Sequence, residues 1–454
     1  MNIENYLHRA AEKLDSFPRD TRVRIVSHYD TDGICSAAIL MKSVERKGFD
    51  FHVSLLNHPF EEEFEKLKKE DNDIIIFSDL GSGQIEQIRE MGADSIILDH
   101  HQPENENPVV DSILQINSNL FGIDGNFEIS GAGLAYLFAK TLDEKNVDLS
   151  VFSLMGAIGD KQNIGGWKGK NREIFEEARK KEIITVSKPS IKAGNDGIVD
   201  EIVYSVDPFY PGLSGRREEV EKLLKGLSIP GDTRYGDLNK EEKKDIHSFL
   251  VLSLLKNNIE PEIMDEVVKE RIISDYLPSN LDVLSDIIDG CSKGGEPGLS
   301  LAFCMNPRKY FEAVKENSRK FREKILEELV KLEEEEGLEE RKNLVYFISD
   351  KASDGSYMSS VVSNYFNCKG KAVFSFTPKN GKIHVSCRAT RKLVEKGLDL
   401  GNVMRETAKK FAGAGGGHKI AAGGTFENVS VDELVDFIDD ILWGENANQV
   451  QAHT

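Results

Sequence analysis

Eight acidic and histidine side chains, gathered in four short groups, are the residues of this chain best suited to chemistry. In chain order they are His28, Asp30, Asp32, Asp79, Asp99, His100, His101 and Asp160. So many carboxylates in one place need bound cations to offset their charge. Oxygen and imidazole ligands without sulfur suit Mn²⁺, with Mg²⁺ or Co²⁺ as substitutes. Two such ions about 3.5–4 Å apart could hold the attacking and the leaving oxygen of a phosphate.

Each of these groups stands where a predicted strand or apolar segment ends. Apolar runs predict strands separated by helical patterns, at 23–26, 51–56, 73–77 and 95–98. This alternation indicates a parallel sheet, and continuous Ile and Val runs are typical of strands buried on both faces. Asp160 closes a pair of apolar helices predicted within 131–158. Because the carboxyl ends of parallel strands line one crevice, we expect the four groups to converge there.

Each group also has a plainer interpretation. A DxDG sequence after a strand is more often a turn, and a His-His pair usually lies on the surface or in the core. An Asp that closes a Gly-rich segment is usually a helix cap. The occurrence of all four groups, each at the end of a strand or segment, favours a metal site over these alternatives.

The same residues lie in motifs that resemble a known family. The segments SHYDTDG (27–33), SDLG (78–81), DHH (99–101) and GAIGD (156–160) resemble the four motifs of the DHH phosphoesterases. Nearer the C-terminus, SCRA (386–389) and GAGGGHKIAAGG (413–424) resemble the substrate-binding subdomain of that superfamily. Between them, GEPGLSLAFCMN (295–306) is similar to archaeal RecJ-like single-strand exonucleases, so the resemblance covers nearly the whole chain.

The resemblance implies a role for each residue of the centre. One metal ion would be bound by His28, Asp30 and Asp79, and the other by Asp32, Asp79, His100 and Asp160, with Asp79 bridging the two. Asp99 would orient a neighbouring imidazole. His101 would contact the scissile phosphate and help to protonate the leaving oxygen. No metal position departs from the family pattern, which counts against a catalytically inactive relative of the Cdc45 type.

The resemblance also implies substrate-binding residues in the C-terminal part. Arg388 would grip a phosphate with its forked guanidinium. The backbone N–H groups of Gly415, Gly416, Gly417 and His418 would cradle the terminal nucleotide, because glycine permits a close approach; a flexible loop is the alternative. Residues 341–425 hold 15 Lys and Arg against 5 Asp and Glu, or +10, in a chain of net charge −20. This basic segment favours a polyanion as partner, although a solvated basic face would have the same charge.

The predicted fold class is α/β: a parallel-sheet DHH catalytic domain, a helical connecting region and a smaller α/β C-terminal substrate-binding domain. The expected divisions are a catalytic core at 1–175, a mainly helical extension of the catalytic lobe at 176–308, a connecting helix at 309–340, the C-terminal domain at 341–444 and a polar tail at 445–454. The family resemblance places the active site in the groove between the two lobes.

Composition argues against several other classes of protein. A hydrophobic fraction of 39% and a charged fraction of 30% are typical of a folded chain. No run approaches the ~18 apolar residues that would cross a bilayer, which predicts no membrane partner and a cytoplasmic location. The five cysteines form no CxxC pair, which argues against a thiolate zinc site and against a disulfide framework.

These features predict a metal-dependent exonuclease that degrades single-stranded DNA, RNA or both to mononucleotides. The long middle region favours a polymeric substrate over a small one. The alternatives are a nanoRNase or cyclic-dinucleotide phosphodiesterase, and a replisome-associated factor with secondary nuclease activity. The expected partners are single-stranded nucleic acid and, by the resemblance, replication-fork or repair-helicase proteins.

Overall fold

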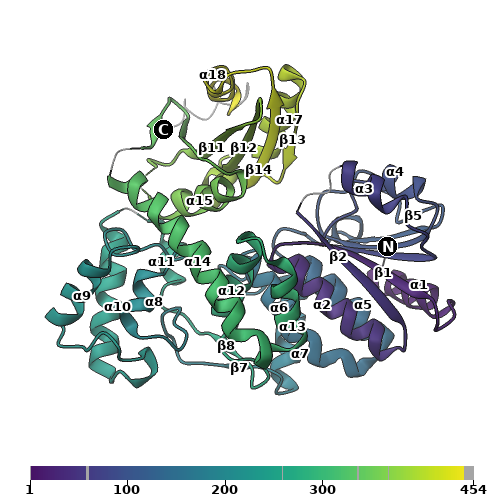
Figure 1. Ribbon diagram of the computed structural model, residues 1–454, viewed down its shortest axis with the longest axis horizontal. Helices are drawn as coiled ribbons and strands as arrows, with labels where there is room; N and C mark the ends of the chain where they lie inside the picture. Colours follow the sequence, from purple (N-terminus) through teal and green to yellow (C-terminus); the bar gives the residue numbers. More distant parts are fainter. Residues whose placement is uncertain (1, 58–60, 258, 335–336, 367, 444–454) are drawn as a thin grey trace. The chain divides into compact units, whose positions relative to one another are not determined.

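The structure is a computed structural model that describes residues 2–57, 61–257, 259–334, 337–366 and 368–443 (Figure 1). It divides into two compact units, each made of two separate stretches of chain. The first unit consists of the described parts of Met1–Gly194 and Lys269–Phe321, and the second of those of Asn195–Val268 and Arg322–Thr454. The polar tail predicted at 445–454 lies outside the described residues.

A parallel sheet organises the first unit, as the alternating pattern predicts. Its strands are β1 (Arg22–His28), β2 (Asp50–Leu56), β3 (Ile74–Ser78), β4 (Asp94–Asp99), β5 (Val109–Val110) and β6 (Ile113–Asn117), in the order β2-β1-β3-β4-β6-β5. All neighbouring pairs are parallel except β5 with β6. Because β1 pairs with both β2 and β3, the order of winding reverses between β1 and β3. Ligands of open α/β sheets bind at the carboxyl ends of the strands beside such a reversal.

Helices cover both faces of this sheet. On one face α2 (Thr31–Arg46) and α5 (Gly131–Leu142) share a core with the inward side chains of β1, and on the other α3 (Glu61–Leu67) and α4 (Ile85–Glu90) cover a second core (Figure 1). The unit also contains α1 (Ile3–Asp15), α6 (Ser150–Gly159), α7 (Gly169–Lys180), α12 (Leu281–Lys293), α13 (Pro297–Met305), the start of α14 (Pro307–Glu334) and the short strands β7 (Thr185–Val186) and β8 (Ile272–Ile273).

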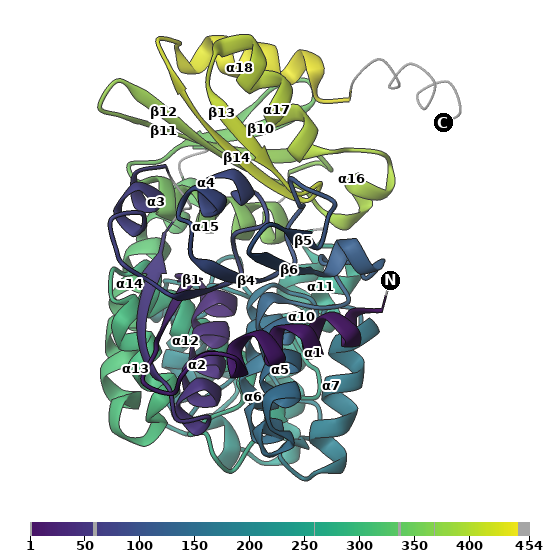
Figure 2. The same ribbon diagram turned by 90° about the vertical axis from the view of Figure 1, so that its right-hand side faces the viewer.

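A mixed sheet organises the second unit. Its strands are β9 (Glu339–Glu340), β10 (Leu344–Ile348), β11 (Ala372–Lys379), β12 (Lys382–Arg388), β13 (Ala414–Gly417) and β14 (Ala421–Glu427), in the order β13-β14-β12-β11-β10-β9. Only β10 and β11 pair in parallel among them. Figure 2 shows α17 (Leu400–Phe411) and α18 (Val431–Ile441) on one face and α15 (Ala352–Tyr365) on the other. A short helix, α16 (Arg391–Glu395), follows β12.

Residues 195–268 add a helical segment to the second unit. Its helices are α8 (Ile198–Val203), α9 (Arg217–Gly226), α10 (Lys240–Leu255) and α11 (Pro261–Asp265). Gly215 has no room for a side chain, since a Cβ would lie 2.8 Å from Val330, and Arg216 pairs with Glu333 at 2.5 Å. Both partners lie on α14 (Pro307–Glu334), the helix predicted at 309–340. The sequence placed all of 176–308 with the catalytic lobe, but these contacts draw 195–268 into the second unit instead.

Within the described residues, no helix combines the length and the apolar character that crossing a membrane requires.

Candidate metal centre

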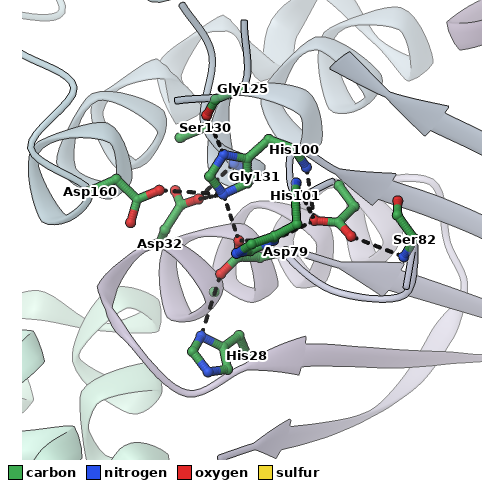
Figure 3. Close-up of polar contacts among 12 residues, drawn as sticks. His28, Asp32, Asp79, Ser82, His100, His101, Gly125, Ser130, Gly131 and Asp160 are labelled. Atoms are coloured by element: carbon green, nitrogen blue, oxygen red, sulfur yellow. Dashed lines mark hydrogen bonds and ion pairs between the residues drawn. The ribbon is translucent and has the colours of Figure 1, made fainter. Parts of the chain in front are cut away.

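The eight side chains predicted from the four motifs meet at the carboxyl edge of the parallel sheet (Figure 3). Three sets of three residues could each bind a metal ion, because within each set the ligand atoms lie within 4.8 Å of one another. These sets are His28 with Asp30 and Asp79, Asp32 with His100 and Asp160, and Asp79 with His100 and His101. Asp79 and His100 each belong to two sets, so Asp79 lies where the sets join.

His28 and Asp30 form one side of the centre, at the junction of β1 and α2. Asp30 caps α2 by accepting the Gly33 N–H at 3.0 Å, and its other oxygen lies 3.0 Å from His28 Nδ1. His28 Nε2 lies 3.1 Å from the main-chain oxygen of Asn57, which can only accept. Nε2 therefore carries the hydrogen, and Nδ1 is left to face Asp30 and, at 3.7 Å, Asp79. A main-chain partner of this kind orients a metal-binding histidine.

His100 is oriented in the same way on the other side. Its Nδ1 donates to the main-chain oxygen of Gly125 at 2.6 Å. Its Nε2 lies 3.1 Å from Asp79, 3.4 Å from Asp160 and 3.7 Å from Asp32. One imidazole nitrogen thus faces three carboxylates, the geometry expected where a cation lies between them.

The N-terminus of α5 holds Asp32, and two glycines make room for it. Asp32 accepts the backbone N–H groups of Gly131 at 2.6 Å and Ala132 at 3.1 Å. A Cβ at Gly131 would lie 2.7 Å from the Cβ of Asp79, and one at Gly156 would lie 2.3 Å from Asp32 Oδ1. The sequence motifs include Gly156, but Gly131 lies outside them, and only its position in space shows that it is needed.

Asp79 is the most constrained residue of the centre. It has a φ of 58°, a left-handed conformation that costs a residue other than glycine about 1–3 kcal/mol. Its side chain is 2% exposed, and its Oδ2 has no hydrogen-bond partner within the described part of the chain. A buried carboxylate oxygen left unpaired is costly, and a bound cation would satisfy it. The residues present therefore fit a divalent metal.

The charges of the centre lead to the same conclusion. Burial, and then the charge of Asp32, raise the pKa of Asp79 well above its usual range. The same two causes raise the pKa of Asp160 well above its usual range. Burial opposes the charged form of His100, but nearby carboxylates, Asp160 first, outweigh it and raise the pKa of His100. Without a cation, the charged forms of Asp79 and Asp160 are therefore disfavoured.

Asp99 and His101 form a pair at the edge of the centre. Asp99 Oδ1 lies 2.7 Å from His101 Nδ1, and Asp99 also accepts the backbone N–H groups of His100 at 2.8 Å and Ser82 at 3.0 Å. Burial opposes the charge of Asp99, but the charge of His101 and these hydrogen bonds hold its pKa below the usual range. The His101 side chain is 43% exposed, so it can meet a substrate while Asp99 fixes its ring.

Two asparagines that the sequence did not single out support this pair. Asn117, the last residue of β6, donates to the main-chain oxygen of His101 at 2.7 Å and to Ser82 Oγ at 2.8 Å. Asn119 donates to the main-chain oxygen of His100 at 3.0 Å. The signal that could have revealed them is the apolar pattern of 113–116 followed by Asn, another polar residue at a strand end.

Comparison with known proteins identifies the family. Residues 22–157 match the N-terminal domain of the DHH family, and residues 341–444 match the DHHA1 domain. An uncharacterized protein of Methanocaldococcus jannaschii is 30% identical over 425 residues, which cover 92% of this chain and 93% of that protein. The chain belongs to the DHH family. DHH membership supports a hydrolase that acts on phosphodiester bonds, and it confirms the α/β fold class with N-terminal DHH and C-terminal DHHA1 domains.

More distant relatives show how widely this fold is shared. The single-stranded-DNA-specific exonuclease RecJ of Thermus thermophilus is 28% identical over 186 residues, 38% of this chain and 27% of that protein. Its structure with Mn²⁺ has a TM-score of 0.60 at 17% identity over 96% of this chain and 54% of that one, so this chain spans about half of its length. Cdc45 of Entamoeba histolytica has a TM-score of 0.61 at 12% identity, over 96% of this chain and 97% of that one. At these identities the two structures show the fold alone.

In the DHHA1 domain of this DHH-family chain, Arg388 lies at the end of β12 against α15. Its guanidinium donates to Ser360 Oγ at 2.8 Å, to Ser356 Oγ at 3.0 Å and to the main-chain oxygen of Cys387 at 2.9 Å. It makes no ion pair with a carboxylate of the described chain. Burial lowers the pKa of Arg388, since nothing acidic beside it offsets the loss of solvent. A partly buried guanidinium flanked by two hydroxyls can receive an anion; the sequence had not indicated the serines.

The glycine-rich segment of the DHHA1 domain is strand β13 at the edge of the mixed sheet, not a loop. A Cβ at Gly415 would lie 2.5 Å from the main-chain oxygen of Met404 on α17, and one at Gly417 would lie 2.6 Å from Ala422 Cα on β14. A Cβ at Gly416 would meet nothing within 4 Å. Gly415 and Gly417 are therefore needed for the fold, whereas Gly416 faces open space.

One donor of the predicted nucleotide cradle is already used. The backbone N–H of His418 donates to the main-chain oxygen of Ala421 at 2.8 Å and closes the β13–β14 turn. The expectation that backbone N–H groups from Gly415 through His418 all receive the nucleotide is therefore corrected at His418. A role for the His418 side chain in binding remains a prediction.

Proposed function

We propose that this chain is an exonuclease that uses divalent metal ions to degrade single-stranded DNA, RNA or both to mononucleotides. The observation that carries the proposal is the 2% exposed carboxylate of Asp79, which belongs to two of the three ligand sets and whose Oδ2 has no hydrogen-bond partner within the described residues. A buried cluster of carboxylates and imidazoles of this composition needs bound cations to offset its negative charge. Mn²⁺ is the preferred ion because imidazole and carboxylate ligands occur together, with Mg²⁺ or Co²⁺ as substitutes.

The ligand sets support the assignment of two ions. The first would be held by His28, Asp30 and Asp79, and the second by Asp32, Asp79, His100 and Asp160. When bound, such ions supply electrostatic stabilisation of the charge on phosphate oxygens. His28 and His100 are already fixed by main-chain oxygens in the orientation that ligation needs.

The protein's own side chains would manage the proton of the leaving group. Asp99 holds His101 by Nδ1 at 2.7 Å and fixes its ring, so the imidazole is placed to donate a proton to the oxygen that leaves. In the DHHA1 domain, Arg388 with Ser356 and Ser360 would bind a phosphate of the strand. The open side of Gly416 would admit the terminal nucleotide. The +10 charge of residues 341–425 would attract a polyanion to this domain.

End-labelled single-stranded DNA and RNA test the proposal. The purified chain is incubated with each in Mn²⁺, next to Asp79→Ala and to a chelator. We expect stepwise shortening from one end by the wild type alone, which would also reveal the polarity and the preferred sugar. If the wild type leaves both polymers intact but cleaves dinucleotides or cyclic dinucleotides, the small-substrate alternative replaces the exonuclease.

An association with replication-fork or repair-helicase proteins is a second proposal for the same chain. It is favoured by the charge outside residues 341–425, about −30, which suits protein contacts better than nucleic acid. Pull-down of purified replisome proteins by wild type and by Asp79→Ala tests it. Equal capture by both would support a contact independent of catalysis, and no capture by either would refute it.

A further inference from the structure

Helix α12, which lies outside the matched DHH and DHHA1 segments, packs directly on the loop that carries His28 and Asp30. Ser292 Oγ hydrogen-bonds the main-chain oxygen of Tyr29, the residue between those two ligands. At the other end of the contact, Thr31 Oγ1 donates to the main-chain oxygen of Ser285 at 3.1 Å. The helix is thus fixed to the centre at both ends of the loop, by a buried hydrogen bond at Thr31 and a partly buried one at Tyr29.

Lys293 is the last residue of this helix and follows Ser292 directly. Its ammonium lies 2.8 Å from Asp289, one turn earlier, and the two side chains are 21% and 18% exposed. The ammonium is therefore held in place yet remains open to solvent. Because Ser292 reaches the main-chain oxygen of Tyr29, the Lys293 side chain that follows it starts beside the loop that carries His28 and Asp30.

We propose that Lys293 is a substrate-contacting residue, which binds an oxygen of the reacting phosphate on the His28–Asp30 side of the centre, and that Asp289 positions it. The inference rests on the proposed function, because it assumes a phosphodiester substrate at this centre. It gives a role to the part of the chain between the two matched domains, for which the motifs offer none.

The Lys293 ammonium at this place favours binding of a substrate phosphate but not binding of the metal ions. A positive charge beside a cation site weakens cation binding, so selection for metal affinity alone would not place an ammonium there. A phosphodiester carries a negative charge, and a lysine ammonium forms a strong, adaptable hydrogen bond with it. Removing a contact made equally to substrate and transition state raises KM and leaves kcat nearly unchanged.

Steady-state hydrolysis of two substrates, with Mn²⁺ affinity measured by calorimetry, tests the proposal. The substrates are a deoxyadenosine dinucleotide with a 5′-phosphate and bis-p-nitrophenyl phosphate, a simple phosphodiester without base or sugar. The variants are Lys293→Met, Lys293→Arg and Asp289→Asn. Lys140→Met is the matched control, because Lys140 is 25% exposed and pairs with Glu177 at 2.6 Å on the last turn of α5, whose N-terminus faces the centre.

We expect Lys293→Met to raise KM for both substrates roughly tenfold, the usual loss for one hydrogen bond to a charged group. kcat should change less than threefold, and Mn²⁺ should bind no more weakly. Lys293→Arg should restore most of the affinity, Asp289→Asn should raise KM by a smaller factor, and Lys140→Met should leave every value unchanged.

Two results would overturn the inference: an unchanged KM in Lys293→Met, or weaker Mn²⁺ binding, which would make Lys293 a structural support of the metal ligands. The small substrate separates this failure from that of the proposed function. If bis-p-nitrophenyl phosphate is hydrolysed with a KM that depends on Lys293 while DNA and RNA stay intact, the exonuclease fails and Lys293 stands. If the wild type hydrolyses none of these substrates, both the proposed function and the role of Lys293 are overturned.

Discussion

Replacing Asp79 by asparagine should stabilise the metal-free protein while removing its activity. The substitution keeps the shape of the side chain but removes one charge from a crowded centre. Asp79 Oδ1 and Asp32 Oδ2 lie 3.1 Å and 3.7 Å from the same nitrogen of His100, so the two carboxylates lie within about 7 Å of each other. At an effective dielectric constant of about 20, their repulsion amounts to about 2 kcal/mol.

This gain should depend on pH in a defined direction. The pKa of Asp79 in the folded chain is raised well above its unfolded value by burial and by Asp32. Its favourable contribution is therefore complete below the unfolded pKa, at about pH 4, and is lost as pH rises through the folded pKa. The metal-free wild type thus bears the full repulsion at high pH, whereas Asp79→Asn does not.

Thermal unfolding in a chelator at pH 5 and pH 8 measures the effect. A gain of about 2 kcal/mol corresponds to a Tm about 4–8 °C higher for a unit of this size, and we expect the gain to be larger at pH 8 than at pH 5. In Mn²⁺ the order should reverse, because the wild type gains binding energy that the variant lacks. A lower metal-free Tm for Asp79→Asn at pH 8, or equal stabilisation of both proteins by Mn²⁺, would refute the reasoning.

Four further changes test other parts of the structure. Mn²⁺ binding should release more protons at pH 5 than at pH 8, since the raised pKa values of Asp79 and Asp160 leave protons to be displaced mainly at the lower pH; calorimetry in two buffers of different ionisation enthalpy measures them. Gly131→Ala should weaken Mn²⁺ binding at least tenfold and destabilise the chain by about 1–3 kcal/mol. Gly236→Ala is the control in the same titration and thermal melt, because a Cβ at Gly236 would meet nothing within 4 Å. Arg388→Ala should weaken substrate use with Mn²⁺ affinity intact, and a parallel fall in metal affinity would make Arg388 structural instead. Gly416→Ala should raise KM without lowering Tm, whereas Gly415→Ala should lower Tm because its Cβ would lie 2.5 Å from the Met404 oxygen.

Much of the metal centre could be predicted because its information is local. Strands β3 and β4 contain continuous apolar runs, and β1 contains one interrupted only by Arg24; the polar residues that each strand positions stand at its end or directly after it. Once the alternation of strands and helices indicated a parallel sheet, convergence of those residues followed from topology alone. The metal and catalytic roles of these residues remain predictions, although the structure brings all eight together.

The parts that escaped prediction depend on contacts between distant segments. Nothing in the sequence near Gly131 indicates that two carboxylates would lie within 3.0 Å of a Cβ at this position. No local pattern links Gly215 to Val330. Strand β13 was not predicted because glycine disfavours strands, and only its pairing with β14 and its contact with α17 hold it extended. Ser356 and Ser360 share one face of α15, which becomes meaningful only beside Arg388.

The order in which the first unit is assembled has a consequence for synthesis of the chain. Helix α12, which fixes Tyr29 and Thr31, is separated from them by more than 250 residues, and the segment 195–268 between them belongs to the other unit. A ribosome must therefore translate about two thirds of the message before the loop that carries His28 and Asp30 gains its support. A nascent chain that extends past Asp160 but ends before Leu281 has all four motifs but lacks the brace that holds the first of them. The metal centre would in this way gain its full support only late, when most of the messenger has already been translated.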